Sequence, residues 1–287
     1  MNLDYLSEIA INGFISTALR EDIGEGDHSS LASVPKDAIQ KARLYVKDTG
    51  ILAGVLLAER IFYKVDPNIN IKIYLKDGQK VKKGDVAFDV EGNARAILMA
   101  ERLVLNCMQR MSGIATKTFE MTKLVAGTKA KLLDTRKTTP NFRMMEKWAV
   151  LIGGGCNHRY NLCDMIMLKD NHVDYAGGIQ KAIESTLAYK KEKNLSIKVE
   201  IETRNLEEVK EVLRVGGIER IMLDNFSPEE IIEALKLIDP LVYETEASGG
   251  IDEDNIGAFA ATGVNFISCG ALTHSYRSLD LSLKAYS

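Results

Sequence analysis

The spacing of hydrophobic positions divides the first half of the chain into three stretches. Residues 3–22 carry apolar side chains at helical intervals and are followed by two glycines, so the pattern predicts an entry helix. From about residue 42 to residue 92, apolar and polar residues alternate between Asp-Gly and Gly-Asp turn pairs, which predicts a β-rich domain. Residues 95–124 return to helical spacing and predict a long amphipathic helix, or two helices broken at Ser112 and Gly113. We place a domain boundary at this break.

One segment of the β-rich stretch allows a second interpretation. Residues 78–92 (GQKVKKGDVAFDVEG) resemble the hairpin of a biotinyl or lipoyl carrier domain, which would give the chain a carrier role. The lysine pair there lies beside Val81 and not in a Met-Lys-Met turn. The favoured interpretation is therefore a compact sandwich.

After the boundary, short apolar runs with strand character alternate with helical segments. Six such units are too many for a small layer fold and favour an α/β barrel, complete or open. A doubly wound open sheet is the structural alternative. The runs are residues 131–133, 165–168, 198–201, 220–223, 241–245 and 265–268.

Composition narrows the class of protein. The chain has 287 residues, of which 46% are hydrophobic and 27% charged, and its formal net charge of −3 provides no global basic field for nucleic acid or membranes. The sequence has neither a basic leader nor an apolar run of bilayer length, so a cytoplasmic location is expected. The four cysteines form no metal or redox motif and are expected to be free thiols.

Polar residues follow the apolar runs with unusual regularity. In a β/α barrel the carboxyl ends of the strands and the loops after them form one mouth, so these residues would converge there. Any one of them alone could be a solvated loop charge or a helix cap. Their recurrence at six consecutive strand ends indicates a site. They are Asp134, Arg136, Lys137, Lys169, Asp170, Glu200, Glu202, Asp224, Asn225, Glu246, Ser248, Cys269 and Gly270.

The expected mouth has two sides of opposite charge. Between residues 134 and 169, six cations face three acids, with His158 among them, so this side should bind an anion. The next two strands supply Glu202 and Asp224, carboxylates that suit a divalent metal, ribose hydroxyls or a developing positive charge. The cations are Arg136, Lys137, Arg143, Lys147, Arg159 and Lys169.

Small residues end the last two strands. ASGGI at 247–251 and SCGAL at 268–272 would let backbone N–H groups approach a phosphate, which barrels usually hold at this position. The triple glycine at 153–155 either ends the preceding helix or supplies a loop that folds over a flat ligand, beside His158 and Arg159.

At these residues the sequence resembles the quinolinate phosphoribosyltransferase family, the decarboxylating nicotinate-nucleotide pyrophosphorylases, over essentially its whole length. Departures from the family pattern are few, with Asn141 and Cys269 where Gly and Val are frequent. The matching stretches are EDIGEGDHSS (21–30), ERLVLNCMQRMSGIAT (101–116), the long block from LLDTRKTTPNFR to MIMLKDNH (132–172), VEIE (199–202), IMLDNF (221–226), EASGGI (246–251) and ISCGALTHS (267–275).

The resemblance implies a fold and an assembly. The expected fold is α/β, with an N-terminal α/β sandwich over residues 1–112 and a C-terminal open barrel of about seven strands over residues 113–274. The tail, 275–287, is expected to pack on the first domain. The family pattern further implies a homodimer, in which each sandwich covers the partner's barrel mouth.

The resemblance also implies a reaction: transfer of a phosphoribosyl group from phosphoribosyl diphosphate to quinolinate, with decarboxylation, in NAD biosynthesis. The implied cofactor is Mg²⁺, held by Glu202 and Asp224. Three residues are expected to be catalytic: Lys169, Glu202 and Asp224. The quinolinate ligands are Arg102 from the partner subunit, Arg136, His158, Arg159 and Lys169. The donor ligands are Lys137, Glu202, Asp224, Ser248, Gly249, Gly250, Gly270 and Ala271.

Two other enzymes would use parts of the same pattern. A lysine at a strand end, here Lys169, also serves a Schiff-base aldolase, although an aldolase has no use for so many arginines. A transferase specific for nicotinate, without decarboxylation, is closer in chemistry. Relatives encoded with molybdate transporters share much of the pattern, which leaves the acceptor more open than the donor.

Overall fold

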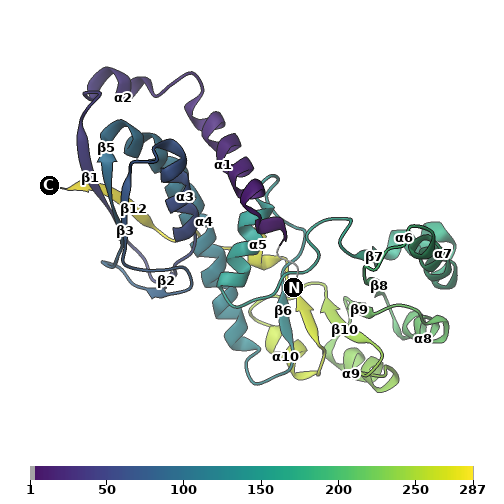
Figure 1. The fold of residues 1–287 in the computed structure, drawn as a ribbon. Coiled ribbons are helices and arrows are strands. Elements are labelled where there is room, and N and C mark those ends of the chain that lie inside the picture. Colours follow the sequence, from purple (N-terminus) through teal and green to yellow (C-terminus); the bar gives the residue numbers. More distant parts are fainter. Residues whose placement is uncertain (1–3, 287) are drawn as a thin grey trace. The chain divides into compact units, whose positions relative to one another are not determined.

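The structure is a computed structural model that describes residues 4–286. Its residues pack into two compact units, which we describe separately (Figure 1). Unit 1 contains the residues up to 119, residues 138–154 and the residues from 272 onward; unit 2 contains residues 120–137 and 155–271. The expected domains 1–112 and 113–274 stay a prediction.

Unit 1 begins with helices. Residue 3, where the expected entry helix starts, lies outside the described residues, and the described part is divided at Ser7, which caps the second segment through a hydrogen bond from the Ala10 amide. A further helix interrupts the stretch that we expected to be β-rich, so that expectation is wrong in part. The helices are η1 (Asp4–Leu6), α1 (Glu8–Ile23), α2 (His28–Ser33) and α3 (Val55–Val65).

The main sheet of unit 1 has four antiparallel strands in the order β12-β1-β5-β3. Its β12 pairs with β1 in a register that joins Lys41 to Tyr286. The carrier hairpin is wrong, because β4 pairs with β2 in a separate two-stranded sheet while β5 lies in the main sheet. The strands are β1 (Ile39–Val46), β2 (Gly50–Ile51), β3 (Asn70–Ile73), β4 (Lys80–Val81), β5 (Val86–Asn93) and β12 (Leu281–Tyr286).

The long helix α4 (Ala94–Leu124) is continuous, so the break expected at Ser112 and Gly113 is wrong. Both residues serve packing. The Ser112 hydroxyl accepts a hydrogen bond from the Ala53 amide and donates one to the Ala53 carbonyl. Gly113 lies against the backbone of Arg277, where a β-carbon would collide with the carbonyl oxygen. Close approach of another segment therefore explains a residue that usually weakens a helix.

Unit 2 is built on a parallel sheet of six strands, as the six apolar runs predict. The fifth run was misplaced: Leu241 and Val242 are exposed in a turn, and the strand begins at Glu244. The strands are β6 (Lys131–Leu133), β7 (Ile166–Leu168), β8 (Val199–Thr203), β9 (Arg220–Asp224), β10 (Glu244–Ser248) and β11 (Phe266–Ser268). The helices of unit 2 that follow its strands are α6 (Asp170–Ala176), α7 (Ile179–Glu192), α8 (Leu206–Val215), α9 (Pro228–Leu237) and α10 (Ile256–Ala261). After β11, α11 (Ala271–His274) begins at the last residue of unit 2 and continues in unit 1.

The strand order β6-β11-β10-β9-β8-β7 distinguishes between the two expected architectures. From β7 to β11 each strand lies beside its predecessor without a reversal, so right-handed crossovers place the helices on one face, as Figure 1 shows for α7, α8 and α9. A doubly wound sheet would need a reversal. The first strand, β6, pairs with the last, β11, as in a barrel, and Cys156 adds a single parallel bridge to β6. Within the described residues the ladder stays open between β6 and β7.

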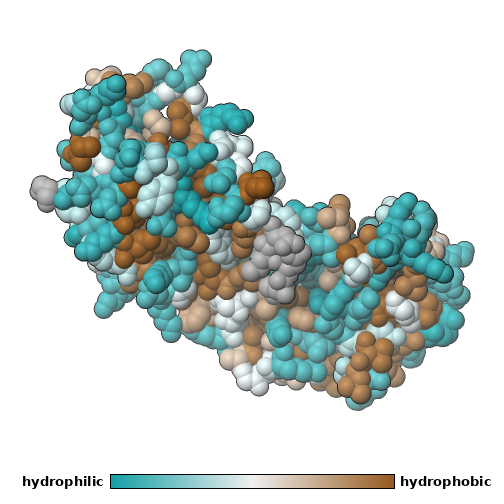
Figure 2. Space-filling model, in the orientation of Figure 1, coloured by the Kyte–Doolittle hydropathy of each residue, from teal (hydrophilic) through white to brown (hydrophobic). Residues whose placement is uncertain are grey.

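The surface visible in Figure 2 is mostly hydrophilic, with hydrophobic residues in separate patches. Over residues 4–286, none of the helices combines the length and the apolar character needed to cross a bilayer. All four cysteines are free, as expected.

Candidate active site

The polar residues that follow the strands of unit 2 lie at one edge of its sheet. The strands are parallel, so their carboxyl ends share that edge. The prediction that the polar residues at the strand ends share one edge of the sheet is confirmed. The residues at the edge are Asp134 after β6, Lys169 after β7, Glu202 and Thr203 in β8, Asp224 in β9, Ser248 in β10, and Cys269 and Gly270 after β11.

The sheet also has one polar and one apolar face. On β8, Val199 and Ile201 are fully buried on the side of the helices, and Glu200 and Glu202 point to the other side. In the register of β8 with β9, Glu200 is level with Arg220. Neighbouring parallel strands at one level turn their side chains the same way, so the polar positions of β8, β9 and β10 form the barrel interior. Parallel strands usually alternate less, because both faces are apolar.

Two arginines meet at the cationic side of the edge. The pKa of Arg159 is lowered by burial and by the positive charge of Arg136, while Glu200 and Asp164 oppose the shift. The Arg159 guanidinium donates a long hydrogen bond, 3.3 Å, to the Met165 carbonyl. Two guanidinium groups close enough to repel each other are favourably placed to share an anion, because planar guanidinium groups bind carboxylates through paired N–H donors.

Carboxylates occupy the adjacent part of the edge. The Lys169 ammonium lies 2.9 Å from Glu202 Oε2, and the Asn225 amide donates to Asp224 Oδ2 at 2.6 Å. Carboxylate oxygens suit Mg²⁺, which commonly takes one or two protein carboxylates and completes its shell with phosphate oxygens and water. Glu202 and Asp224 fit such a site, and the diphosphate would have to supply further ligands.

Two glycine loops close the last two strands. Asn225 fills the space where a β-carbon of Gly249 would stand, so only glycine allows these two loops to pack. Gly250 has a positive φ of 60° and faces open space. The Cys269 thiol donates to the Ile251 carbonyl at 3.0 Å and ties the loop after β11 to the loop after β10. Gly270 and Ala271 follow Cys269 directly in the chain, and α11 begins at Ala271.

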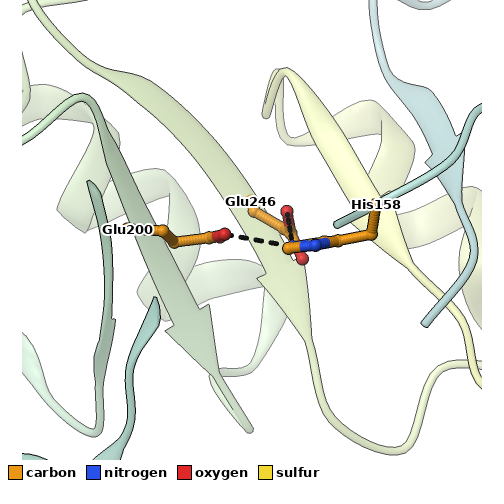
Figure 3. A group of neighbouring side chains, drawn as sticks. All are labelled: His158, Glu200 and Glu246. Atoms are coloured by element: carbon orange, nitrogen blue, oxygen red, sulfur yellow. Dashed lines mark ion pairs between the residues drawn. The ribbon is translucent and has the colours of Figure 1, made fainter. Parts of the chain in front are cut away.

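The His158 ring lies beneath this edge in a buried ion cluster (Figure 3). Its Nε2 is 3.0 Å from Glu200 Oε2 and 3.4 Å from Glu246 Oε2, and its Nδ1 accepts the Arg159 backbone N–H at 2.7 Å. Arg220 donates to Glu246 Oε2 at 3.0 Å from the neighbouring strand. His158 is 8% exposed, and both glutamates are fully buried.

Protonation in this cluster is shared. Burial and the Glu246 charge raise the pKa of Glu200 to about 7; burial opposes charge on His158, but Glu246 and Glu200 raise its pKa to about 9. Both shifts favour the protonated forms of these groups near neutral pH.

The remaining cations expected at the site are distributed between the two units. Arg143 and Lys147 lie on α5 (Arg143–Ile152) in unit 1, and Gly153 caps this helix, which confirms the helix-ending role of the glycine run. Arg102 is exposed on α4, also in unit 1. Lys137 is exposed in unit 2, next to Arg136.

The helix α4 carries a stripe of apolar side chains between Ile97 and Met108, and most of it is covered within the chain. Ile97, Leu103, Leu105 and Met108 are buried, and Leu98 alone of the stripe is exposed, at 45%. Unit 1 therefore buries most of this stripe by itself.

Two family models match successive parts of the chain. The model described as the N-terminal domain of quinolinate phosphoribosyl transferase matches residues 27–112, and the C-terminal domain model matches residues 114–284. The chain belongs to the quinolinate phosphoribosyl transferase family. Membership in this family excludes the aldolase and carrier alternatives.

Individual relatives agree with this family over nearly the full chain. A mitochondrial quinolinate phosphoribosyltransferase [decarboxylating] from Nicotiana tabacum is 46% identical over 96% of this chain and 82% of its own length. A probable nicotinate-nucleotide pyrophosphorylase [carboxylating] from Bacillus subtilis is 39% identical over 97% and 94%. Among solved structures, NadC from Streptococcus pyogenes superimposes with a TM-score of 0.91 at 38% identity, covering 98% of this chain and 99% of that one. The α/β fold expected from the family is confirmed.

The structure thus brings together most of the site expected from the family, and adds to it. Lys169, Glu202, Asp224 and the glycine loops share one sheet edge, with Arg136 and Arg159 beside them. The ion cluster around His158 was missed: Glu200 and Glu246 pair with the ring, and Arg220 pairs with Glu246. The alternation in VEIET, RIMLD and ETEAS was the available signal.

Proposed function

We propose that this protein transfers the phosphoribosyl group of phosphoribosyl diphosphate to quinolinate and releases CO₂, giving nicotinate mononucleotide and pyrophosphate. The observation that carries the proposal is the pairing of Arg136 and Arg159 beside the carboxylates of Glu202 and Asp224, at one barrel edge of a chain in this family. A dianionic acceptor and a cationic transition state need these two kinds of charge side by side.

The acceptor carries two adjacent carboxylates on a pyridine ring. Arg136 and Arg159 suit paired hydrogen bonds to them, and Lys169 adds a third positive charge next to Glu202. Unit 1 has an exposed groove of about 290 Å³. Leu98 and Glu101 of α4 border this groove, and Arg102 is the residue that follows Glu101. This groove supports the proposal that a partner subunit covers α4 in a homodimer and receives Arg102 at its own barrel mouth.

The donor is assigned to the other half of the edge. The loops with Ser248, Gly249 and Gly250, and with Gly270 and Ala271, offer backbone N–H groups to the 5′-phosphate. Lys137 is the candidate for the diphosphate. Mg²⁺, when bound by Glu202, Asp224 and the diphosphate, would neutralise charge on the leaving group.

Transfer requires one bond to break and one to form at C1′ of the ribose. Pyrophosphate leaves with the electron pair of the C1′–O bond, and the ring nitrogen of quinolinate supplies the pair for the new N–C1′ bond. The carbon between them develops positive charge, which Glu202 and Asp224 are placed to stabilise by about 3 kcal/mol each. The pyridinium ring then accepts the electron pair of the C2–carboxylate bond as CO₂ departs, and C2 takes a proton from water.

The proposal is tested by measuring pyrophosphate and ¹⁴CO₂ released from phosphoribosyl diphosphate with quinolinate or nicotinate as acceptor. We expect both products with quinolinate, in equal amounts, and neither with nicotinate. Pyrophosphate release with nicotinate alone would replace the proposal with a transferase that does not decarboxylate. Turnover should cease in excess EDTA and return with Mg²⁺; undiminished turnover in EDTA would contradict the metal assignment.

Two expectations remain predictions. Assembly as a homodimer is tested by light scattering. A cytoplasmic location is tested by fractionation, and it matters because the tobacco relative is named as mitochondrial.

A further inference from the structure

Asn225 follows Asp224 at the carboxyl end of β9, and its backbone lies in the left-handed region with a φ of 58°. Its place before α9 would suit a helix cap, but the cap of α9 is Ser227, whose hydroxyl accepts the Glu230 N–H at 3.2 Å. A residue with a β-carbon in this conformation costs free energy that other contacts must offset. Capping of α9 therefore does not explain Asn225.

The side chain of Asn225 turns back to the preceding residue. Its Nδ2 donates to Asp224 Oδ2 at 2.6 Å, a short distance that is typical of a hydrogen bond to a charged acceptor. The direction of this bond follows from the chemistry, because an ionised carboxylate can only accept. The bond engages one oxygen and fixes the plane of the carboxylate, which sets where the other oxygen points.

Asn225 also holds the glycine loop that follows β10. Its backbone N–H donates to the Ser248 carbonyl at 2.8 Å. Its side-chain amide occupies the space that a β-carbon of Gly249 would need, and the positive φ of Gly249, 96°, independently favours glycine there. One residue thus contacts both parts of the edge that are assigned to the donor, the Asp224 carboxylate and the 5′-phosphate loop.

The donor has to span these two parts. Its C1′ atom and its 5′-phosphate are joined through a ribose ring of fixed size, so the carboxylate and the phosphate loop must keep one separation. The register of β9 with β10, in which Asp224 is level with Ser248, fixes the two backbones. It fixes neither the orientation of the carboxylate nor the course of the loop beyond the strand. Asn225 contacts both.

We propose that Asn225 is a positioning residue, which orients the Asp224 carboxylate through its side chain and sets the distance from that carboxylate to the glycine loop. This inference rests on the proposed function for the identity of the donor. In this role Asn225 acts through Asp224 and the loop and does not contact the reacting atoms. The alternative is that only the left-handed turn matters, in which case glycine would serve equally well.

The kinetic test compares Asn225→Gly with Asn194→Gly. Asn194 is also left-handed, with a φ of 52°, but it lies in the turn between α7 and β8, at the opposite end of the sheet. We expect Asn225→Gly to lower kcat/KM for phosphoribosyl diphosphate by about tenfold or more, while the KM for quinolinate changes less than about twofold. Asn194→Gly should change neither. Wild-type kinetics in Asn225→Gly, or an equal rise in both KM values, would overturn the inference.

A double-mutant cycle then tests the route through Asp224. In an Asp224→Ala background, Asn225→Gly no longer has a carboxylate to misplace, so only its effect on the glycine loop remains. The combined loss in kcat/KM should therefore be smaller than the product of the two single losses, by at least about threefold. Losses that multiply fully would show that Asn225 acts independently of Asp224, and would reject the inference.

A measurement without substrate separates this inference from the proposed function. In ¹⁵N-labelled protein, with the Asn225 side-chain amide assigned through Asn225→Gly, we expect one of its two protons to resonate downfield because it is bonded to a carboxylate. Asp224→Asn should move this signal upfield, and Asn194→Gly should leave it unchanged. A signal that does not respond to Asp224→Asn would overturn the inference, whatever the donor is. The expected signals in a protein that releases no pyrophosphate from phosphoribosyl diphosphate would reject the proposed function instead.

Discussion

Each of the two units contains a cluster of charged side chains on its main sheet, and the clusters differ in how completely they are hydrogen-bonded. In unit 1, Asp89 accepts from Arg43 Nε and Nη2 at 2.6 and 2.7 Å, from the Tyr74 hydroxyl at 2.9 Å and from the Tyr286 hydroxyl at 2.8 Å. These donors hold the pKa of Asp89 well below its ordinary value, with Arg43 the main cause. One acid with four hydrogen bonds is a stabilising arrangement.

In unit 2 the buried carboxylates have fewer hydrogen bonds than Asp89. Glu200 and Glu246 lie fully buried around one imidazole, and the pKa of Glu200 is raised by burial and by the charge of Glu246. A buried charged group can therefore have a role other than stabilising the fold. The Asp89 cluster joins β1, β5 and β12 of one sheet with Tyr74, the residue that follows β3. The His158 cluster instead fixes one loop beside a predicted binding site.

The largest effect is expected where charge in unit 2 meets the ligand. Lys169→Ala and Arg159→Ala should each lower kcat/KM for quinolinate by on the order of 10²-fold or more while the fold survives, as circular dichroism would verify. Arg204→Ala is the matched control: Arg204 pairs with Asp174 and Glu208 on the surface, and its loss should change kcat/KM less than about twofold. Wild-type activity in either folded variant would contradict the site assignment.

A second prediction uses the location of Arg102 in unit 1. If Arg102 serves the partner's barrel mouth, mixed and exchanged Arg102→Ala and Lys169→Ala proteins should recover up to about a quarter of wild-type activity. Half the dimers are then mixed, and half of their sites are intact.

The control for this mixture is Arg159→Ala with Lys169→Ala. Both changes lie in unit 2, so every mixed site keeps one defect and no recovery is expected. An inactive first mixture, after subunit exchange has been demonstrated by mass spectrometry, would place Arg102 outside the partner's site.

Removing Asp89 should act on stability alone. Asp89→Ala leaves Arg43 and two tyrosine hydroxyls without their common acceptor, and we expect the free energy of unfolding to fall by about 2 kcal/mol. Urea unfolding followed by fluorescence measures this loss. The KM values should stay as in the wild type; a changed KM for quinolinate would break the contrast between the units.

The last effect concerns pH. Glu200 and His158 have raised pKa values, about 7 and about 9, so the folded protein binds more protons than the unfolded chain in this range. Stability should therefore fall as pH rises from 6 to 9. Asp89 has a lowered pKa, and its contribution is present in this range and is lost only in acid.

Urea unfolding at pH 6, 7.5 and 9 checks this slope. Glu246→Gln removes the charge that raises both values and should flatten it, whereas Asp89→Asn should leave the slope as in the wild type. A wild-type stability that rises over this range would contradict the raised pKa values of Glu200 and His158.

The sequence predicted the fold better than the inside of the site. Six strands of unit 2 were predictable because each apolar run is short and bounded by helical spacing. The helix α3 was missed because it lies between segments in which apolar and polar residues alternate, and the whole stretch was assigned to strands. Its buried apolar residues are Val55, Leu57, Ala58, Ile61 and Phe62. Gly113 was taken for a break because its packing partner, Arg277, is remote in sequence.

Residues at strand ends were predictable as a group, because parallel strands place them at one edge. The roles of Glu200 and Glu246 were not, since they depend on which face each strand turns inward. The same applies to His158: its type and neighbours suggest a ligand contact, but the placement of its two nitrogens is visible only in three dimensions.

The pairing of β12 with β1 has a consequence for the order in which the protein is made. The ribosome releases β1 early, and its edge lacks a partner until the last strand of the sheet emerges. Unit 2, whose final segment ends at residue 271, can be complete before that moment. During synthesis β1 is thus an unpaired edge, open to other chains. Nascent chains held on the ribosome by a C-terminal extension, so that residue 271 has left the exit tunnel and residue 281 has not, should present a native barrel and a protease-sensitive first sheet.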